Sequence, residues 1–106
     1  MSDTAQLARE ISSKLPAGQL NLVCENAPEG TNQDGVSYKD LCNKCLNVDT
    51  NAEMQKACVA GVVAGFVQDR QSGAVPQQQA DKDATALSAC DGNPDSAECL
   101  GLGAGY

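Results

Sequence analysis

Residues 42–70 read CNKCLNVDTNAEMQKACVAGVVAGFVQDR, and this stretch decides the fold that the sequence predicts. Thr50-Asn-Ala-Glu53 fits a capping box, in which the Thr hydroxyl and the Glu carboxylate satisfy free amides at a helix start. The apolar residues that follow cover a wide arc of a helix: Ala57, Cys58, Val59, Val62, Val63, Phe66 and Val67. We therefore expect the helix Met54–Arg70 to be the central and most buried element.

Gly61 and Gly65 lie four residues apart within this expected helix. Each glycine lowers helix propensity by about 1 kcal/mol relative to alanine, so the pair needs a reason. One reason is a groove that accepts a helix of a partner, and the other is close packing against segments of the same chain. The sequence favours close packing, because a small cysteine-linked domain packs tightly.

Amphipathic patterns predict two short helices before the central one. Asp3 or Thr4 caps the first, which ends at Pro16 and Gly18, and Ser37 caps the second. The apolar faces consist of Leu7, Ala8, Ile11 and Leu15 in the first helix, and of Leu41, Cys42, Cys45 and Leu46 in the second.

Helical signals also follow the central helix. Pro76 suits the first position of a helix that runs to about Cys90. Asn93-Pro94 then starts one more turn, which ends at Cys99 or Leu100. The residues of the longer helix that we expect to face inward are Ala80, Ala84 and Leu87.

The remaining segments are less regular. Gln19–Cys24 alternates polar and apolar residues and is predicted to be a short extended piece. Glu25–Gly35 has the composition of a loop, and the glycine-rich tail Gly101–Tyr106 is expected to fray. The predicted fold class is mainly α: one domain over residues 1–106, a small disulfide-stabilised bundle of about four short helices with at most one extended segment.

Composition explains why disulfides are expected. Only 19 of the 106 residues are Leu, Ile, Val or Phe, or about 18%, which is below the roughly 20% at which a highly charged chain tends toward disorder. So thin an apolar core does not easily offset the loss of chain entropy. Three disulfides, each contributing about 2–4 kcal/mol, would supply the missing stability.

The six cysteines are therefore interpreted as structural, and they are Cys24, Cys42, Cys45, Cys58, Cys90 and Cys99. Six cysteines allow 15 pairings, and the sequence does not choose one. Cys42 and Cys45 share a helix face, so they are expected to bond to different partners rather than to each other. Cys24 and Cys58 are the near candidates, and Cys90 and Cys99 flank a turn across which they could close.

Metal and redox alternatives compete with this structural role. Cys42, Cys45, Cys58 and one more cysteine would make a four-thiolate zinc site, although a second CxxC is missing. Cys42-Asn-Lys-Cys45 would be a redox pair only if it began a helix after a strand. Asp91-Gly-Asn93-Pro-Asp95 is similar to the start of a calcium loop and would bind calcium weakly. Asp81 and Asp83 are most simply explained as a solvated helix start. No metal ligand or cofactor is assigned.

Several classes of function are disfavoured by composition. The chain has no histidine, which removes Ser–His and Cys–His catalysis and histidine-ligated metal sites. Its net charge of −7 repels nucleic acid, and no run of 18 apolar residues exists to span a membrane. The aromatic platforms of a glycosidase are also scarce, so no catalytic residue is assigned and no enzyme is expected.

One segment, Asp34-Gly-Val-Ser-Tyr38-Lys-Asp-Leu-Cys42-Asn-Lys-Cys45, resembles part of a Kazal-type protease inhibitor. That family carries D-G-x-T/S-Y-x-x-x-C-x-x-C, and the match covers 12 of the 106 residues. The family also has a cysteine seven residues before the tyrosine, where this chain has Thr31. A protease inhibitor with a degenerate Kazal-like segment is therefore an alternative function, and no reactive residue is transferred.

The cysteine content favours an oxidising compartment, and we expect a secreted, extracellular protein. The first residues, MSDTAQLARE, are polar and unlike a secretory signal, so the expectation is a mature region preceded by an added Met1. In composition the chain looks like the small cysteine-rich proteins that fungi and oomycetes export, including effectors that act in virulence. The predicted function is non-enzymatic binding of a protein, which could come from a host, or of a small ligand. An acidic surface favours a basic or cationic partner.

Overall fold

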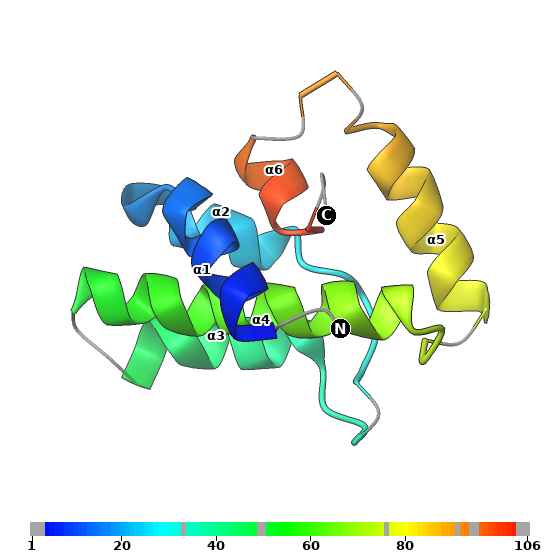
Figure 1. Cartoon of the computed structure of the whole chain (residues 1–106), viewed down its shortest axis with the longest axis horizontal. Helices are drawn as coiled ribbons and strands as arrows, with labels where there is room; N and C mark the ends of the chain where they lie inside the picture. Colours follow the sequence, from blue (N-terminus) through cyan, green and yellow to red (C-terminus); the bar gives the residue numbers. More distant parts are fainter. Residues whose placement is uncertain are drawn as a thin grey trace.

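The computed structural model describes residues 4–32, 34–48, 51–75, 77–90, 92–93 and 96–103. Within these residues no strand forms beyond an isolated bridge between Thr31 and Ser37. The helices are α1 (Thr4–Lys14), α2 (Leu20–Glu25), α3 (Tyr38–Val48), α4 (Ala52–Gln71), α5 (Gln77–Ser88) and α6 (Ala97–Leu100), with a 3-10 turn η1 (Ala17–Gln19) before α2 (Figure 1). The expected mainly α, disulfide-linked fold is confirmed, with six α-helices in the described residues where about four were expected.

Helix α4 is the central element, as its sequence predicted. Both α1 and α3 pack along it, and its buried residues are Val59, Ala60, Val63, Ala64, Phe66 and Val67 (Figure 1). Its cap differs from the prediction: the Asn51 side chain accepts hydrogen bonds from the amides of Glu53 and Met54, at 2.9 and 3.4 Å. Asn51 is closer to the helix start than Thr50, which lies outside the described residues, and asparagine is an equally good cap.

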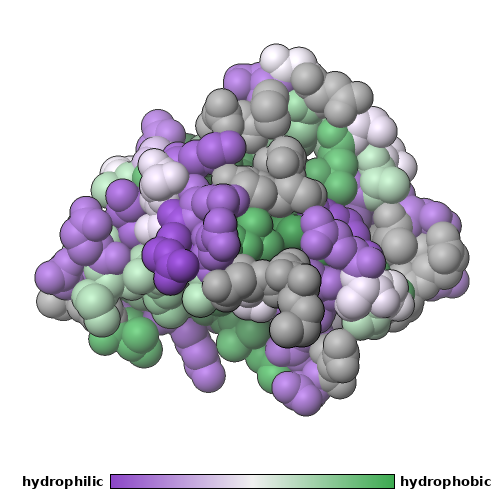
Figure 2. Space-filling view, viewed as in Figure 1, coloured by the Kyte–Doolittle hydropathy of each residue, from purple (hydrophilic) through white to green (hydrophobic). Residues whose placement is uncertain are grey.

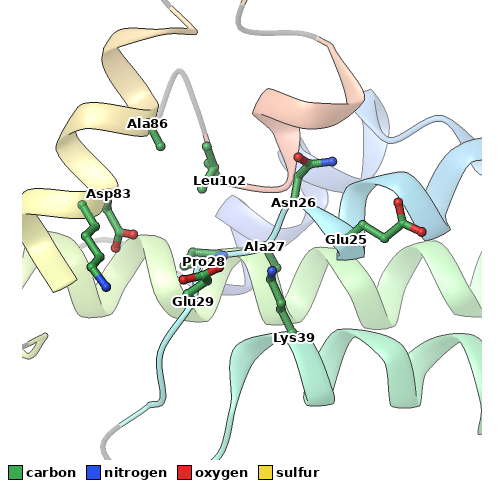
Figure 3. Close-up of a pocket in the computed structure, with 10 residues that line it drawn as sticks. Glu25, Asn26, Ala27, Pro28, Glu29, Lys39, Asp83, Ala86 and Leu102 are labelled. Carbon is green, nitrogen blue, oxygen red and sulfur yellow. The ribbon is translucent and has the colours of Figure 1, made fainter.

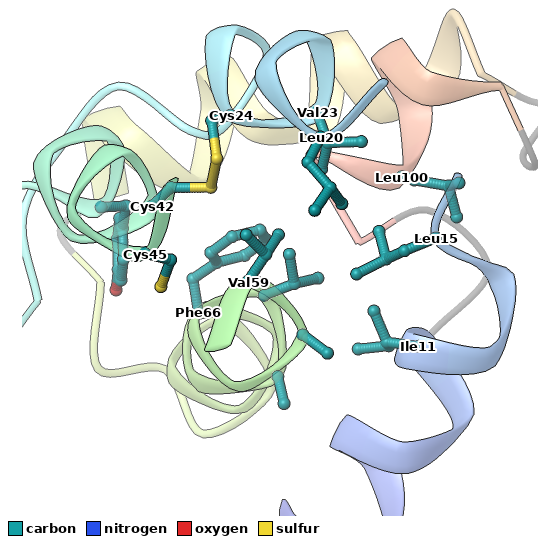
Figure 4. Close-up of a cluster of buried hydrophobic side chains, with 14 of the residues drawn as sticks. Ile11, Leu15, Leu20, Val23, Cys24, Cys42, Cys45, Val59, Phe66 and Leu100 are labelled. Atoms are coloured by element: carbon teal, nitrogen blue, oxygen red, sulfur yellow. A yellow bond between two sulfur atoms is a disulfide. The ribbon is translucent and has the colours of Figure 1, made fainter. Parts of the chain in front are cut away.

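The apolar core lies where α1, α2, α3 and α6 meet α4 (Figure 4). Ile11 and Leu15 enter it from the end of α1, and Leu100 enters it from α6. The Tyr38 ring contacts Phe66 edge to face, with 5.3 Å between the ring centroids. Cys24, Cys42 and Cys45 are at most 2% exposed and belong to the same cluster, so two bridges extend this core.

Three disulfides tie the helices together, and no described cysteine is free. Cys24 bonds to Cys42, which joins α2 to α3, and Cys45 bonds to Cys58, which joins α3 to α4. The third bridge joins Cys90 to Cys99 across the turn between α5 and α6. Cys42 and Cys45 thus bond to different partners, in agreement with their shared helix face.

The prediction of an extended Gln19–Cys24 segment is wrong, because this segment forms η1 and α2. Leu20, Val23 and Cys24 are all buried, at spacings of three and four residues. This spacing is helical, and it coexists with the short polar–apolar alternation on which the extended prediction was based.

The glycine-rich end of the chain is also better ordered than predicted. Gly101 and Gly103 are buried, and the Arg70 guanidinium donates a 2.9 Å hydrogen bond to the carbonyl oxygen of Leu102. A Cβ on Gly101 would overlap the carbonyl oxygen of Val23, so the turn sits directly on α2. The expectation of a frayed tail therefore does not describe residues 101–103, while residues 104–106 lie outside the described residues.

Close packing does not explain the two α4 glycines. Gly61 is exposed, and a Cβ at either Gly61 or Gly65 would meet no heavy atom within 4 Å. The expectation of close packing there is therefore wrong. Gly61 is exposed and Gly65 is half-buried, and each has room for a methyl group.

The last two helices differ in detail from their predictions. On α5, Ala84 is exposed rather than inward and Leu87 is half-buried, while Pro76 and the Ala80 side chain lie outside the described residues. Helix α6 is capped by Ser96, whose hydroxyl accepts a hydrogen bond from the Cys99 amide, and not by Asn93. A serine cap directly before the helix competes successfully with the Asn-Pro signal, whose proline lies outside the described residues.

Candidate functional site

A cavity of about 270 Å³ lies between α5 and the body of the molecule (Figure 3). Its walls come from four places in the chain: the segment that follows α2, the first turn of α3, one face of α5 and the C-terminal turn. The lining residues are Glu25, Asn26, Ala27, Pro28, Glu29, Lys39, Lys82, Asp83, Ala86 and Leu102.

Apolar side chains form the middle of the cavity. Ala86 and Leu102 point into it from above in Figure 3, and Ala27 and Pro28 lie opposite. Asn26 helps to hold this segment, because its side-chain amide donates a 2.8 Å hydrogen bond to the carbonyl oxygen of Leu22 at the end of α2. A small apolar group would therefore meet apolar surface on two sides.

Charged groups of both signs surround this apolar middle. Glu25, Glu29 and Asp83 bring carboxylates, and Lys39 and Lys82 bring ammonium groups. Asp83 is the one buried charged residue among the described side chains, at 6% exposed. Burying a carboxylate costs free energy unless polar or charged groups compensate it. The groups around Asp83 must therefore supply this compensation.

Arg70 supplies part of that compensation. Its guanidinium is half-buried, and burial lowers its pKa, while the negative charge of Asp83 acts in the opposite direction. The same guanidinium donates to the carbonyl oxygen of Leu102, one of the residues that line the cavity. From α4, Arg70 thus hydrogen-bonds to the C-terminal turn and interacts electrostatically with Asp83 on α5.

A second hollow, of about 380 Å³, lies on the outer face of α3. Its lining residues are Val36, Asp40, Leu41, Asn43, Lys44 and Asn47. Apart from the half-buried Leu41, all of them are exposed, and no buried charged group faces it. The cavity beneath α5 is therefore the better candidate for a site.

The structure removes the zinc-thiolate and redox alternatives. Every sulfur of the proposed thiolate set is in a disulfide, so no thiolate is left to bind zinc. Cys42 and Cys45 are not bonded to each other. Among the residues that the structure describes, no group of acidic or sulfur side chains could hold a metal ion. The calcium-like segment falls mostly outside these residues, with Asn93 exposed.

The Kazal-like segment forms a loop followed by the start of α3. The Asn32 side chain accepts hydrogen bonds from the amides of Asp34 and Val36, at 2.9 and 3.0 Å. Gly35 turns the loop with a φ of 81°, which favours glycine. Thr31, at the position of the family's cysteine, is bridged to Ser37 through the backbone, so hydrogen bonds rather than a disulfide shape this loop.

The sequence did not predict this cavity, because Asp83 was interpreted as part of a solvated helix start. That interpretation is wrong, since Asp83 is buried. A signal was present: Asp83, Ala86, Leu87 and Cys90 recur at spacings of three and four, which places an acid on the inward face of a helix. Lys39 and Glu29 carried no comparable signal, because only the fold brings them to α5.

No protein-family model, curated protein sequence or solved structure matches this chain. In the described part of the chain, no helix combines the length and apolar character needed to cross a membrane. On the face shown in Figure 2, hydrophilic residues are interspersed with pale and hydrophobic ones wherever the residues are coloured.

Proposed function

We propose that this chain is a secreted, non-enzymatic binding protein that holds a small ligand in the cavity beneath α5. The observation that supports the ligand site most strongly is the buried Asp83 carboxylate in the wall of a 270 Å³ cavity. Concave sites that combine apolar walls with a few fixed polar groups are the usual form of small-molecule sites.

The size and charge of the cavity define the ligand class. Its volume is slightly below the roughly 300–1,000 Å³ of pockets for drug-sized ligands, so the ligand is a smaller molecule. Carboxylates and ammonium groups both line the cavity, which favours a molecule with hydrogen-bond donors and acceptors around a short apolar part. The net charge of −7 adds a preference for a cationic group.

Secretion is supported by the three disulfides, since such bonds persist in oxidising compartments. The non-enzymatic part of the proposal rests on the absence of histidine from the sequence. The likeness in composition to exported effectors extends the proposal to a role in virulence, with a ligand of host origin.

The test is a titration of the oxidised protein with four sets of small molecules, followed through amide chemical shifts by NMR. The sets are primary amines, carboxylates, amino acids and neutral amides. We expect one set to shift the amides of Ala27, Glu29, Lys39 and Ala86 selectively. In Ala86→Phe the added ring fills the cavity, and these shifts should disappear.

The matched control is Ala84→Phe, the same substitution on the same helix at an exposed position. It should bind like the parent protein. Failure of all four sets to shift the cavity amides at millimolar concentrations, or equal binding by Ala86→Phe and the parent, would contradict the proposal.

A further inference from the structure

We infer that α5 is a movable cover: it detaches from the body as a unit, while the other helices stay folded, and so opens the cavity. This inference rests on the proposed function, because it describes how a ligand would reach the proposed site. Its physical basis is the way in which α5 is attached.

In the part of α5 whose side chains are described, the helix is separate from the main apolar core. No described α5 side chain belongs to that cluster, and α5 shares no extended interface with another helix in the part of the chain described. Its apolar attachment is Leu87, which packs in a separate small cluster with Cys90, Cys99 and Leu102. Segments with few buried apolar contacts open at lower free energy than the core does.

The covalent connections of α5 to the rest of the chain are few. Gly73, with a φ of 74°, turns the chain after α4, and α5 begins at Gln77. At the other end, the Cys90–Cys99 bridge ties the helix to α6 but leaves the preceding turns free of covalent links. Figure 1 shows α5 at one side of the molecule, beside the body rather than wrapped by it.

Asp83 holds the cover in place. It is the only α5 residue among those described that is buried, and its negative charge acts on the half-buried guanidinium of Arg70 on α4. Opening would expose the Asp83 carboxylate to water, and closing would restore its electrostatic interaction with Arg70. Asp83 is therefore a positioning residue for α5 as well as part of the cavity wall.

Amide hydrogen exchange of the native, fully oxidised protein tests this inference without any ligand. We expect the amides of Asp81–Ser88 to exchange as a group, at least about tenfold faster than those of Val59–Val67 in α4. Asp83→Asn should accelerate the α5 group by a further factor of about ten and leave α4 unchanged. Asp81→Asn, the same change at an exposed position of α5, should accelerate neither.

Three results would overturn the inference: equal protection of α5 and α4, an Asp83→Asn effect that extends equally to α4, or the same exchange in Asp83→Asn and Asp81→Asn. Each is separate from the ligand test. A protein that binds none of the four sets could still open α5, and a protein that binds one of them could keep α5 closed until global unfolding.

Discussion

The hydroxyl of Tyr38 donates a hydrogen bond to the carboxylate of Asp69, with 2.7 Å between the two oxygens. Tyr38 is the first residue of α3, and Asp69 lies near the end of α4, so the bond joins the two helices at one end. The Tyr38 ring is 3% exposed and packs edge-on against Phe66. One side chain thus combines apolar burial with a charge-assisted hydrogen bond.

Replacing Tyr38 by Phe keeps the ring and removes the hydroxyl. We expect the free energy of unfolding to fall by about 1–2 kcal/mol, because the half-buried Asp69 carboxylate loses a donor. Urea unfolding with the disulfides intact measures this change. Thr4→Val is the control: its exposed 2.6 Å bond to Gln68 should be worth less than about 0.5 kcal/mol. Equal losses in the two variants would contradict the account.

Tyr38 also predicts how stability depends on alkaline pH. Burial raises the pKa of its phenol well above the ordinary value of 10.0, and the hydrogen bond to Asp69 and the charges of Asp69 and Asp83 act in the same direction. A raised folded pKa gives a stabilisation that is fully present below the unfolded pKa and is lost as the pH rises above it.

The wild-type protein should therefore lose more stability than Tyr38→Phe between about pH 9 and pH 11. Urea midpoints at these two pH values provide the measurement, and the variant corrects for the titration of lysines. Identical pH dependence in the two proteins would show that the Tyr38 phenol does not titrate with unfolding.

The close approach of Gly101 to α2 predicts that a single added methyl group lowers the free energy of unfolding strongly. In Gly101→Ala the new Cβ would overlap the backbone carbonyl of Val23, and neither backbone can move without disturbing α2 or α6. We expect a loss of about 3 kcal/mol or more in urea unfolding. A loss below about 1 kcal/mol would mean that the turn is not seated on α2.

The two α4 glycines predict an effect of the opposite sign on the free energy of unfolding. Gly61→Ala adds a methyl group in open space and removes a flexible residue from a helix interior, so it should stabilise the protein by about 1 kcal/mol. Thermal unfolding followed by circular dichroism measures it, and Gly65→Ala should behave alike. Destabilisation by either change would reinstate the close packing that the sequence suggested.

Local sequence signals predicted the elements that are stabilised locally. Helix α4 was predictable because its apolar arc runs over many turns, and the start of α3 because Ser37 caps it: the Asp40 amide donates to the Ser37 hydroxyl at 3.2 Å. The separate partners of Cys42 and Cys45 followed from helical geometry. The choice between Cys24 and Cys58 did not, because it depends on how α2 and α4 flank α3.

The candidate site could not be predicted as a whole either, because it depends on how segments distant in the sequence pack together. The spacing of Asp83 from Leu87 and Cys90 marks it as inward, but the fold alone brings it within electrostatic range of Arg70, 13 positions earlier in the sequence. Similarly, a run of glycines predicts a flexible tail unless a side chain such as Arg70 binds its carbonyl oxygens. The partners of Asp83 and of the C-terminal carbonyl oxygens are set by tertiary contacts, and no local pattern encodes those partners.

The claim on which the account depends is that three specific disulfides hold a thin core together. They close loops of 18, 13 and 9 positions, and each should contribute about 2–4 kcal/mol. Reduction should therefore abolish most of the helical circular dichroism signal, whereas the oxidised protein unfolds cooperatively on heating.

The most direct measurement is peptide mapping by mass spectrometry of the unreduced protein, with free thiols blocked under denaturing conditions before digestion. The account predicts no blocked thiol and three linked pairs: Cys24 with Cys42, Cys45 with Cys58, and Cys90 with Cys99. A blocked cysteine in the folded protein, or a link between Cys42 and Cys45, would contradict it.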